Sequence, residues 1–350
     1  MSAAAGIPVR QQRTASQWRA LGVVCPHCHG ALRDADGGGL VCDGCGTSFP
    51  VTCGIPDLRT AGDPYLTREE DAAAAERLTA AADAMDFAAL HALYYEGNAK
   101  VPPAQVAQFT RGVLAASHRA GATLDVWDAL GGTLPADAAV VDLGCGTAPL
   151  GVQLAMRGQP VLGVDAGLRW LVLARKRASD AGTDLPVICA NAEALPLADG
   201  CVQAMTGESV LENLADLERA LEEAHRVVAP GGSLRISTPN KHSLGPDPHL
   251  GVMAGGFWPE PKLRARAARD GKVFPIRRLL SGAALRRLLS DAGFERLRMA
   301  LPRIAAEQRA GLPSTVNLAI TGYHIARRTP ILRALVLRVG PTMLCTAIRE

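Results

Sequence analysis

The stretch Val140-Val141-Asp142-Leu143-Gly144-Cys145-Gly146-Thr147 decides the fold of this chain. Its first four residues predict a buried strand, and its glycines let the backbone turn sharply and approach a ligand closely as a helix begins. Asp165 ends the next apolar run about 20 residues later, where a carboxylate can accept hydrogen bonds from two ribose hydroxyls. A glycine-rich turn between strand and helix indicates a nucleotide-bearing cofactor but does not identify it.

Strand and helix patterns alternate on both sides of this turn, from residue 138 to residue 240. Predicted strands lie at Ala139–Leu143, Val161–Val164, Val187–Ala190, Val202–Thr206 and Ser233–Thr238. Predicted helices between them lie at Leu150–Met156, Leu168–Ala181 and Asp216–Val228. A further helix at Ser281–Ala292 and an edge strand near Phe294–Leu301 follow. The alternation predicts a Rossmann-like α/β fold, a parallel sheet with helices on both faces.

Three further motifs follow the glycine turn in order. They are Gly163-Val164-Asp165, the acidic loop Asn191–Asp199, and the Glu-x-x-Arg-Val-Val-x-Pro-Gly-Gly pattern of Glu223–Gly232. Together with the turn they resemble class I S-adenosylmethionine-dependent methyltransferases of the ubiquinone/menaquinone biosynthesis type, over roughly residues 140–294. A nicotinamide dehydrogenase is the alternative for such a turn, but the acidic loop and the Pro-Gly-Gly turn have no place there.

The resemblance implies a binding site for S-adenosylmethionine. The positions that it assigns to the cofactor are Asp142, Gly144, Cys145, Gly146, Asp165, Ala166, Asn191, Ala192 and Glu208. The glycine turn would face the methionine moiety, Asp165 would hold the ribose, and Asn191 would accept a bond from the adenine amino group. The family's third glycine is replaced here by Ala148, which is small enough for us to expect binding to survive.

Two Cys-x-x-Cys pairs near the N-terminus predict a metal site. Cys25 and Cys28 are separated from Cys42 and Cys45 by 13 residues. Two such turns close a four-sulfur tetrahedral site of the structural zinc type. With Gly54-Ile55-Pro56-Asp57-Leu58 behind them, these pairs resemble the Trm112-like zinc ribbons. Related ribbons precede the methyltransferase domain of rRNA guanine methyltransferases, which implies RNA as an alternative partner.

These patterns divide the chain into successive parts. We predict a disordered leader (1–20), a zinc ribbon (21–60), a helical linker or cap (61–135), an S-adenosylmethionine-binding domain (136–302) with an insert (240–280), and a basic C-terminal extension (303–350). The linker pattern predicts helices over Glu69–Leu93 and Ala104–His118. The tail Ile331–Ile348 is amphipathic. Two interpretations stay open for it: burial against the main domain and peripheral contact with a membrane.

Charge is distributed unevenly along the chain. Residues 261–350 hold 18 Lys/Arg and 5 Asp/Glu, a local net of +13, whereas residues 1–260 hold 19 and 29. A basic C-terminal third indicates an anionic partner or a set of solvated helix faces. The cysteine pattern is not that of a secreted disulfide framework, and no apolar run approaches the length that spans a bilayer. We therefore expect a cytoplasmic protein.

The methyl acceptor is not encoded in a single motif. No Asn/Asp-Pro-Pro-Tyr/Phe signature stands at Glu208–Asn213, which argues against DNA-adenine and protein-glutamine methylation. Candidate catalytic residues are Glu208 and two histidines of the Pro/Gly-rich insert, His242 and His249. We expect transfer to a small metabolite or natural product, an anionic one included. The alternatives are rRNA or tRNA base methylation and a non-catalytic cofactor-binding adaptor.

Overall fold

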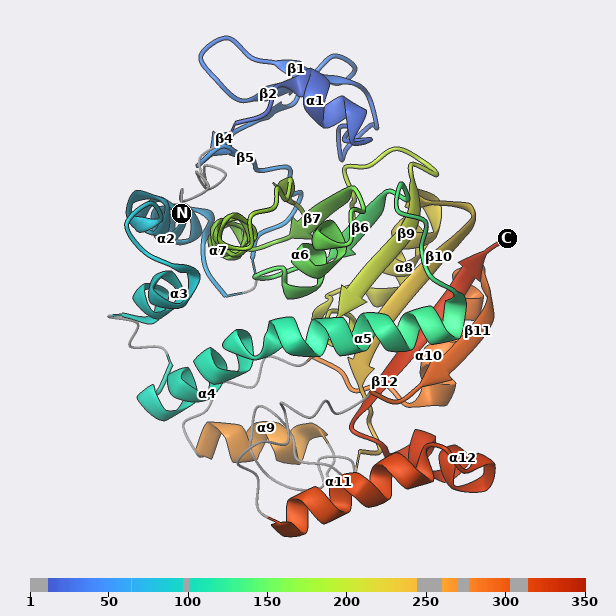
Figure 1. The fold of residues 1–350 in the computed structure, drawn as a ribbon. Coiled ribbons are helices and arrows are strands. Elements are labelled where there is room, and N and C mark those ends of the chain that lie inside the picture. Colours follow the sequence, from blue (N-terminus) through green and yellow to red (C-terminus); the bar gives the residue numbers. More distant parts are fainter. Residues whose placement is uncertain (1–11, 64, 97–100, 244–259, 270–276, 303–313) are drawn as a thin grey trace, which may run out of the picture.

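A seven-stranded sheet forms the centre of the molecule (Figure 1). The computed structural model describes residues 12–63, 65–96, 101–243, 260–269, 277–302 and 314–350. The strand order is β11-β12-β10-β9-β6-β7-β8. The strands are β6 Val140–Leu143, β7 Val161–Asp165, β8 Val187–Cys189, β9 Val202–Glu208, β10 Val228–Pro239, β11 Phe294–Ala300 and β12 Thr342–Arg349. Strands β10, β9, β6, β7 and β8 are parallel, and β12 lies antiparallel between β10 and β11.

The chain order reverses at the centre of this sheet. Strand β6 pairs with β7 on one side and with β9 on the other. In open α/β sheets such a reversal creates a crevice at the carboxyl ends of the strands, where ligands bind. The Rossmann-like α/β class predicted from the sequence is confirmed, and the glycine turn lies at this crevice.

Side chains alternate between the two faces of the strands, so each face has its own core. Val140 belongs to one core and its neighbour Val141 to the other. The first core contains residues of α2 Arg68–Ala81, α3 Phe87–Tyr95, α5 Ala116–Gly131, α6 Pro149–Met156 and α7 Leu168–Asp180. The second contains residues of α8 Leu217–Val227, α10 Gly282–Asp291 and the N-terminal ribbon.

The ribbon is joined directly to the large domain. Its strands are β1 Leu32–Asp34, β2 Leu40–Cys42, β3 Ser48–Phe49, β4 Val51–Thr52 and β5 Ile55–Pro56. Backbone bridges connect Val23 to Leu197 and Asp57 to Cys189. The connection from β8 to β9, residues 190–201, contains no helix. The ribbon therefore packs on a part of the sheet where a crossover helix would otherwise be expected.

The prediction of a disordered leader over residues 1–20 is wrong for residues 12–20. Residues Ala15–Ala20 form helix α1, and Thr14 closes its start with a capping box to Gln17. Trp18 is only 2% exposed and packs in the second core. Burial of this one large aromatic ring helps to order a segment that was predicted from the sequence to be disordered. Residues 1–11 lie outside the described part of the chain.

The predicted C-terminal extension over 303–350 also needs correction. Helix α12 spans Pro330–Val339, and the chain then continues as strand β12 instead of prolonging the helix over the predicted tail. Cys345 pairs with Ile236 of β10 and Met299 of β11. The chain end is therefore an inner strand of the sheet, and helices α11 Ser314–Ala326 and α12 are an excursion between β11 and β12.

The predicted linker helices are each divided in two. The stretch Glu69–Leu93 becomes α2 and α3, because the Asp86 side chain caps a new helix by accepting from the Ala89 N–H at 2.8 Å. The stretch Ala104–His118 becomes α4 Pro103–Leu114 and the first turn of α5.

Helix α9, Glu260–Arg269, lies within the insert. No helix among the described residues is long and apolar enough to cross a bilayer.

Candidate functional site

The glycine turn between β6 and α6 adopts a backbone conformation that its sequence explains. Gly144 and Gly146 have φ angles of 59° and 53°. A Cβ on Gly144 would overlap the side chain of Val210, whereas one on Gly146 would meet nothing within 4 Å. Ala148, which replaces the family's third glycine, takes the same left-handed conformation (φ 50°) at a cost of about 1–2 kcal/mol. The turn is thus tightly packed at Gly144 and borders open space at Gly146.

Asp165 holds this turn from the end of β7. Its Oδ2 accepts the Gly146 N–H at 2.9 Å, and its Oδ1 accepts the Gly167 N–H at 2.8 Å. Burial raises the pKa of the carboxyl group. Each carboxylate oxygen has a second lone pair, so both can also accept from a ligand hydroxyl. The geometry is compatible with the ribose-binding role that the resemblance implies.

Asp142 lies beneath the turn. It is 2% exposed, its Oδ2 accepts the Gly151 N–H of α6 at 2.9 Å, and its Oδ1 accepts the Thr206 hydroxyl at 3.2 Å. Burial raises its pKa to about 7. The neighbouring Cys145 is also buried, and a Cβ on Gly163 would lie 3.1 Å from its Sγ. The thiol therefore points into the sheet, and only the backbone of Cys145 can face a ligand.

Two acidic side chains lie at the end of β9 and in the turn that follows it. Strand β9 pairs directly with β6, the strand that leads into the glycine turn. Glu208 accepts the Thr123 hydroxyl at 3.2 Å, and burial raises its pKa. Glu212 is 3% exposed and accepts the Thr238 hydroxyl at 3.1 Å. Burial, with a contribution from the negative charge of Glu208, raises its pKa to about 7. Sequence reasoning did not assign Glu212, for which an acid directly after the apolar pair Val210-Leu211 was only a weak signal.

Asn191 has a different partner from the one expected. Its Oδ1 accepts the N–H groups of Thr60 and Ala61, both at 2.9 Å. Both lone pairs of this oxygen are thus engaged, so the predicted bond from an adenine amino group to it needs correction. Ala192 beside it is 7% exposed. The segment that leaves the ribbon therefore lies along the proposed adenine edge of the site.

The candidate histidines are not brought to the site by the described part of the insert. His242 is exposed, and its backbone N–H donates to Asn240 Oδ1 at 3.0 Å. The Asn240 amide nitrogen donates to the carbonyls of Arg338 and Gly340, both at 3.0 Å. Asn240 therefore fastens the end of α12 to the end of β10. His249 lies outside the described residues, so its catalytic role stays a prediction.

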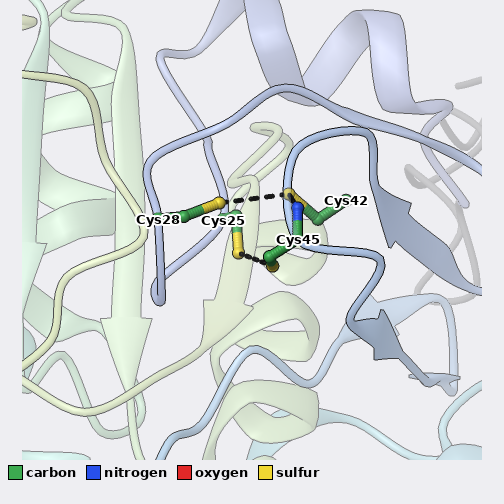
Figure 2. Close-up of side chains that lie close together, drawn as sticks. All are labelled: Cys25, Cys28, Cys42 and Cys45. Atoms are coloured by element: carbon green, nitrogen blue, oxygen red, sulfur yellow. Dashed lines mark hydrogen bonds between the residues drawn. The ribbon is translucent and has the colours of Figure 1, made fainter.

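The four predicted cysteines converge on one point (Figure 2). All four sulfur atoms lie within 4.8 Å of one another, with 3.7 Å between Cys25 and Cys45 and 3.4 Å between Cys28 and Cys42. Backbone N–H groups of His27 and Gly44 point at Cys25 and Cys42, at 3.4 Å and 3.3 Å. Four thiolates with such donors fit a closed, tetrahedral structural zinc site.

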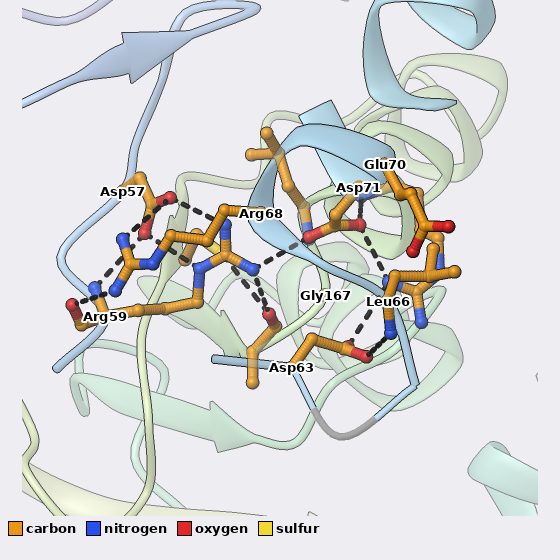
Figure 3. A network of polar contacts seen from close by, with 12 residues as sticks. Asp57, Arg59, Asp63, Leu66, Arg68, Glu70, Asp71 and Gly167 are labelled. Carbon is orange, nitrogen blue, oxygen red and sulfur yellow. Dashed lines mark hydrogen bonds and ion pairs between the residues drawn. The ribbon is translucent and has the colours of Figure 1, made fainter. Parts of the chain in front are cut away.

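A buried ionic network links the ribbon to the edge at which the resemblance places the cofactor (Figure 3). Arg59 is 4% exposed and donates to Asp57 (2.6 and 2.8 Å), to Asp71 (2.8 Å) and to the carbonyl of Ala166 (2.9 Å). Arg169, in the first turn of α7, donates to the other oxygen of Asp71 at 2.7 Å. Ala166 directly follows Asp165, so Arg59 contacts the backbone at the position expected beside the adenine.

The carboxylate of Asp71 also holds the start of helix α7. The side chain of Asp71 accepts the Leu168 N–H at 2.8 Å, next to the Gly167 N–H that Asp165 accepts. Asp63 adds a second carboxylate for Arg169 at 3.2 Å. Sequence reasoning missed this network because nothing in the local pattern pairs residues about a hundred positions apart.

Comparison with known families agrees with this geometry. Residues 141–236 match the model of a methyltransferase domain, Methyltransf_11, and residues 23–54 match that of Trm112p-like proteins. The two matches cover the glycine turn with the strands around it, and the cysteine cluster. The resemblance stated from the sequence motifs is thereby confirmed.

Curated relatives match parts of the chain. The demethylmenaquinone methyltransferase of Thermus thermophilus is 40% identical over 99 residues, 28% of this chain and 45% of that protein. The ubiquinone/menaquinone biosynthesis C-methyltransferase UbiE of Methylobacterium nodulans is 31% identical over 172 residues, 44% of this chain and 65% of that protein. An uncharacterized 37.1 kDa protein in transposon TN4556 of Streptomyces fradiae is 29% identical over 202 residues, 53% of each. The chain therefore spans about half to two thirds of these relatives.

Removal of one cluster cysteine is expected to release zinc and loosen the ribbon. Cys42→Ser should reduce the zinc content from one atom per chain to near none and lower the melting temperature. Zinc binding is worth roughly 10 kcal/mol in isolated zinc-finger peptides, and Cys25 and Cys42 share the second core with the sheet. Cys53→Ser, outside the cluster, is the matched control and should retain the metal. Full zinc content in Cys42→Ser would contradict the site.

Loss of the Asp71 carboxylate should be costly, because Arg59 and Arg169 then remain buried with fewer partners. Asp71→Ala is expected to lower the free energy of unfolding by about 3–5 kcal/mol. Asp125→Ala removes the partner of an exposed pair with Arg157 and should cost about 1 kcal/mol or less. Denaturant unfolding of both variants measures the difference, and equal effects would show that the network does not support the structure.

Proposed function

We propose that this chain, which carries a class I S-adenosylmethionine-dependent methyltransferase domain behind a Trm112-like zinc ribbon, transfers the methyl group of that cofactor to a small-molecule acceptor. When bound, S-adenosylmethionine supplies a methyl group on a positively charged sulfonium sulfur. One observation carries the proposal. Carboxylates near the carboxyl ends of three neighbouring strands, Asp142, Asp165 and Glu208, surround a glycine turn that borders open space.

The charge of these side chains favours a cationic ligand. Burial and mutual repulsion raise the pKa values of clustered carboxyl groups, and a nearby positive charge stabilises their ionised form. The carboxyl groups of Asp142 and Glu212 both have pKa values of about 7 for these reasons. A sulfonium compound would relieve the repulsion, whereas the pyrophosphate of a dinucleotide would increase it. The site therefore supports S-adenosylmethionine over a nicotinamide cofactor.

The acceptor would enter beside the end of β9. Much of the rate of methyl transfer comes from holding the acceptor atom in line with the methyl carbon. Glu208 and Glu212 stand two residues before and two residues after Val210, whose side chain packs against Gly144, and on this ground we place both next to the turn. A buried carboxylate with a raised pKa can take a proton from an acceptor hydroxyl or an acidic carbon. We assign this role to one of these two glutamates, and His249 stays a further candidate.

The relatives support a class of acceptor. Their names place them in menaquinone and ubiquinone biosynthesis, which favours a small ring compound with a nucleophilic carbon or oxygen. The reduced thiols that the zinc site needs favour a cytoplasmic setting. Demethylmenaquinone, a short phenolic analogue and an RNA transcript, each incubated with enzyme and S-adenosylmethionine, separate the alternatives through release of S-adenosylhomocysteine. Product from RNA alone would overturn the small-molecule assignment, and cofactor binding without any product would indicate the adaptor.

Cofactor binding should depend on Asp165. Asp165→Ala removes both oxygens that can accept ribose hydroxyls, so calorimetry should show affinity for S-adenosylmethionine at least about a hundredfold weaker. Asp165→Asn keeps one acceptor oxygen and should recover part of the affinity. Asp125→Ala serves as an exposed control and should bind like the parent. Unchanged binding in a folded Asp165→Ala variant would refute the assigned cofactor site.

Cofactor affinity should also rise with pH through about 7. Burial raises the pKa of Asp142 to about 7, so the carboxyl is neutral below that pH and ionised above it. A sulfonium prefers the ionised form, and affinity should increase by up to about tenfold per pH unit on the acidic side. S-Adenosylhomocysteine, which lacks the positive sulfur, should respond less, and Asp142→Asn should reduce the slope. Equal pH profiles for both ligands would exclude this electrostatic role.

A further inference from the structure

Helices α11 and α12 expose large apolar side chains. Leu318 is 73% exposed and Ile325 60% on α11, and Ile331 is 85% exposed and Leu335 56% on α12. Helix α12 has no buried residue. Soluble monomers rarely leave clustered apolar surface of this kind without a partner. The two helices therefore form a candidate interaction surface, called here the C-terminal helix pair (Ser314–Ala326 and Pro330–Val339).

The exposed residues are spaced as on a contact face. Leu318 and Ile325 are seven residues apart, which places them on one side of α11, and Ile331 and Leu335 are one turn apart on α12. The two helices contact each other and lie at the end of the molecule opposite the zinc ribbon (Figure 1). The apolar residues are thus gathered on one projecting unit.

The same unit is strongly basic. From Ser314 to Gly340 the sequence contains four arginines and no aspartate or glutamate. Arg328, Arg333 and Arg338 are exposed. Arg327 instead points inward and donates to the carbonyl of Leu301 at 2.9 Å. Three exposed cationic side chains therefore lie on the same unit as the exposed leucines and isoleucines, and long arginine side chains can place an apolar stem beside lipid while the charge stays at the surface.

The combination of exposed apolar side chains and exposed arginines selects among the possible partners of the C-terminal helix pair. A second copy of the chain would bring two sets of arginines together without an acid to balance them, and a purely polar partner such as RNA would leave the apolar residues in water. A bilayer with anionic headgroups satisfies both features at once. We propose that the C-terminal helix pair docks on the surface of an anionic membrane and lies in its interface without crossing it.

The docked helices would lie close to the active site. Asn240, the residue after β10, donates to the carbonyls of Arg338 and Gly340 and so joins the end of α12 to the carboxyl end of the sheet. That is the edge at which the glycine turn lies. Provided that the proposed methyl transfer is correct, a membrane-dissolved acceptor could then reach the enzyme without passing through water. The docking itself does not depend on the reaction.

Vesicle flotation tests the docking with the full-length protein. Vesicles of equal parts phosphatidylcholine and phosphatidylglycerol should carry the protein, whereas pure phosphatidylcholine should carry much less. Ile331→Glu with Leu335→Glu should weaken binding by more than about tenfold, because two apolar anchors are lost and two negative charges are added. Arg333→Gln and Arg338→Gln should each weaken it about fivefold, on anionic vesicles only and less at high salt.

The controls separate docking from folding and from catalysis. Met156→Glu replaces an apolar residue that is 59% exposed on α6 and should float like the parent. Cofactor affinity by calorimetry should be unchanged in all these variants, so loss of flotation with intact cofactor binding isolates the membrane surface. Failure of the parent to float would overturn the proposal. Self-association or RNA binding that Ile331→Glu with Leu335→Glu abolishes, in a parent that does not float, would assign the surface to that partner instead.

Discussion

The carboxylate of Asp71 has no exposed surface, and two guanidinium groups and the backbone N–H groups of Leu168 and Arg169 surround it. A buried charge without such partners would cost several kcal/mol, so the segments that supply them are held in one arrangement. Arg59 comes from the exit of the ribbon and Arg169 from the start of α7. Through Arg59 the same network reaches the carbonyl of Ala166, one residue after Asp165. The position of the proposed cofactor edge is therefore coupled to that of the ribbon.

This coupling explains why a zinc module is built into an α/β domain. The connection between β8 and β9 lacks a helix, and the ribbon covers this part of the sheet through two backbone bridges and a shared apolar core. A unit of short strands has little core of its own, so a metal ion is an effective way to keep it rigid. A bound zinc ion would then act at a distance from the proposed reaction. It would stiffen the segment whose Thr60 and Ala61 N–H groups donate to Asn191 Oδ1.

Local pattern predicted the sheet, the glycine turn and the cysteine cluster, because each depends on neighbours within a few residues. Local pattern failed where the structure of a segment depends on burial against distant parts of the chain. Trp18 is buried in a leader that was predicted to be disordered, and Cys345 lies on an inner strand although it belongs to a tail that was predicted to be an amphipathic extension. At the site, the position of Asp165 beside the glycine turn could be predicted from its spacing to the turn. The partners of Asn191, and the burial that raises the pKa of Glu212, arise from contacts between distant segments and left little trace in the sequence.

The uneven charge of the chain has a physical consequence for how it can work. The acidic first part supplies the carboxylates around the glycine turn, and the basic last part includes the C-terminal helix pair. If these carboxylates and the arginines of the helix pair lay together, they would neutralise each other as internal ion pairs. The excursion between β11 and β12 carries three exposed arginines out to the end of the molecule opposite the ribbon (Figure 1). The carboxylate of Asp142 is buried at the crevice, whereas the three arginines are exposed to solvent, so the two sets suit different partners: the proposed cation at the crevice and the proposed anionic surface at the helices.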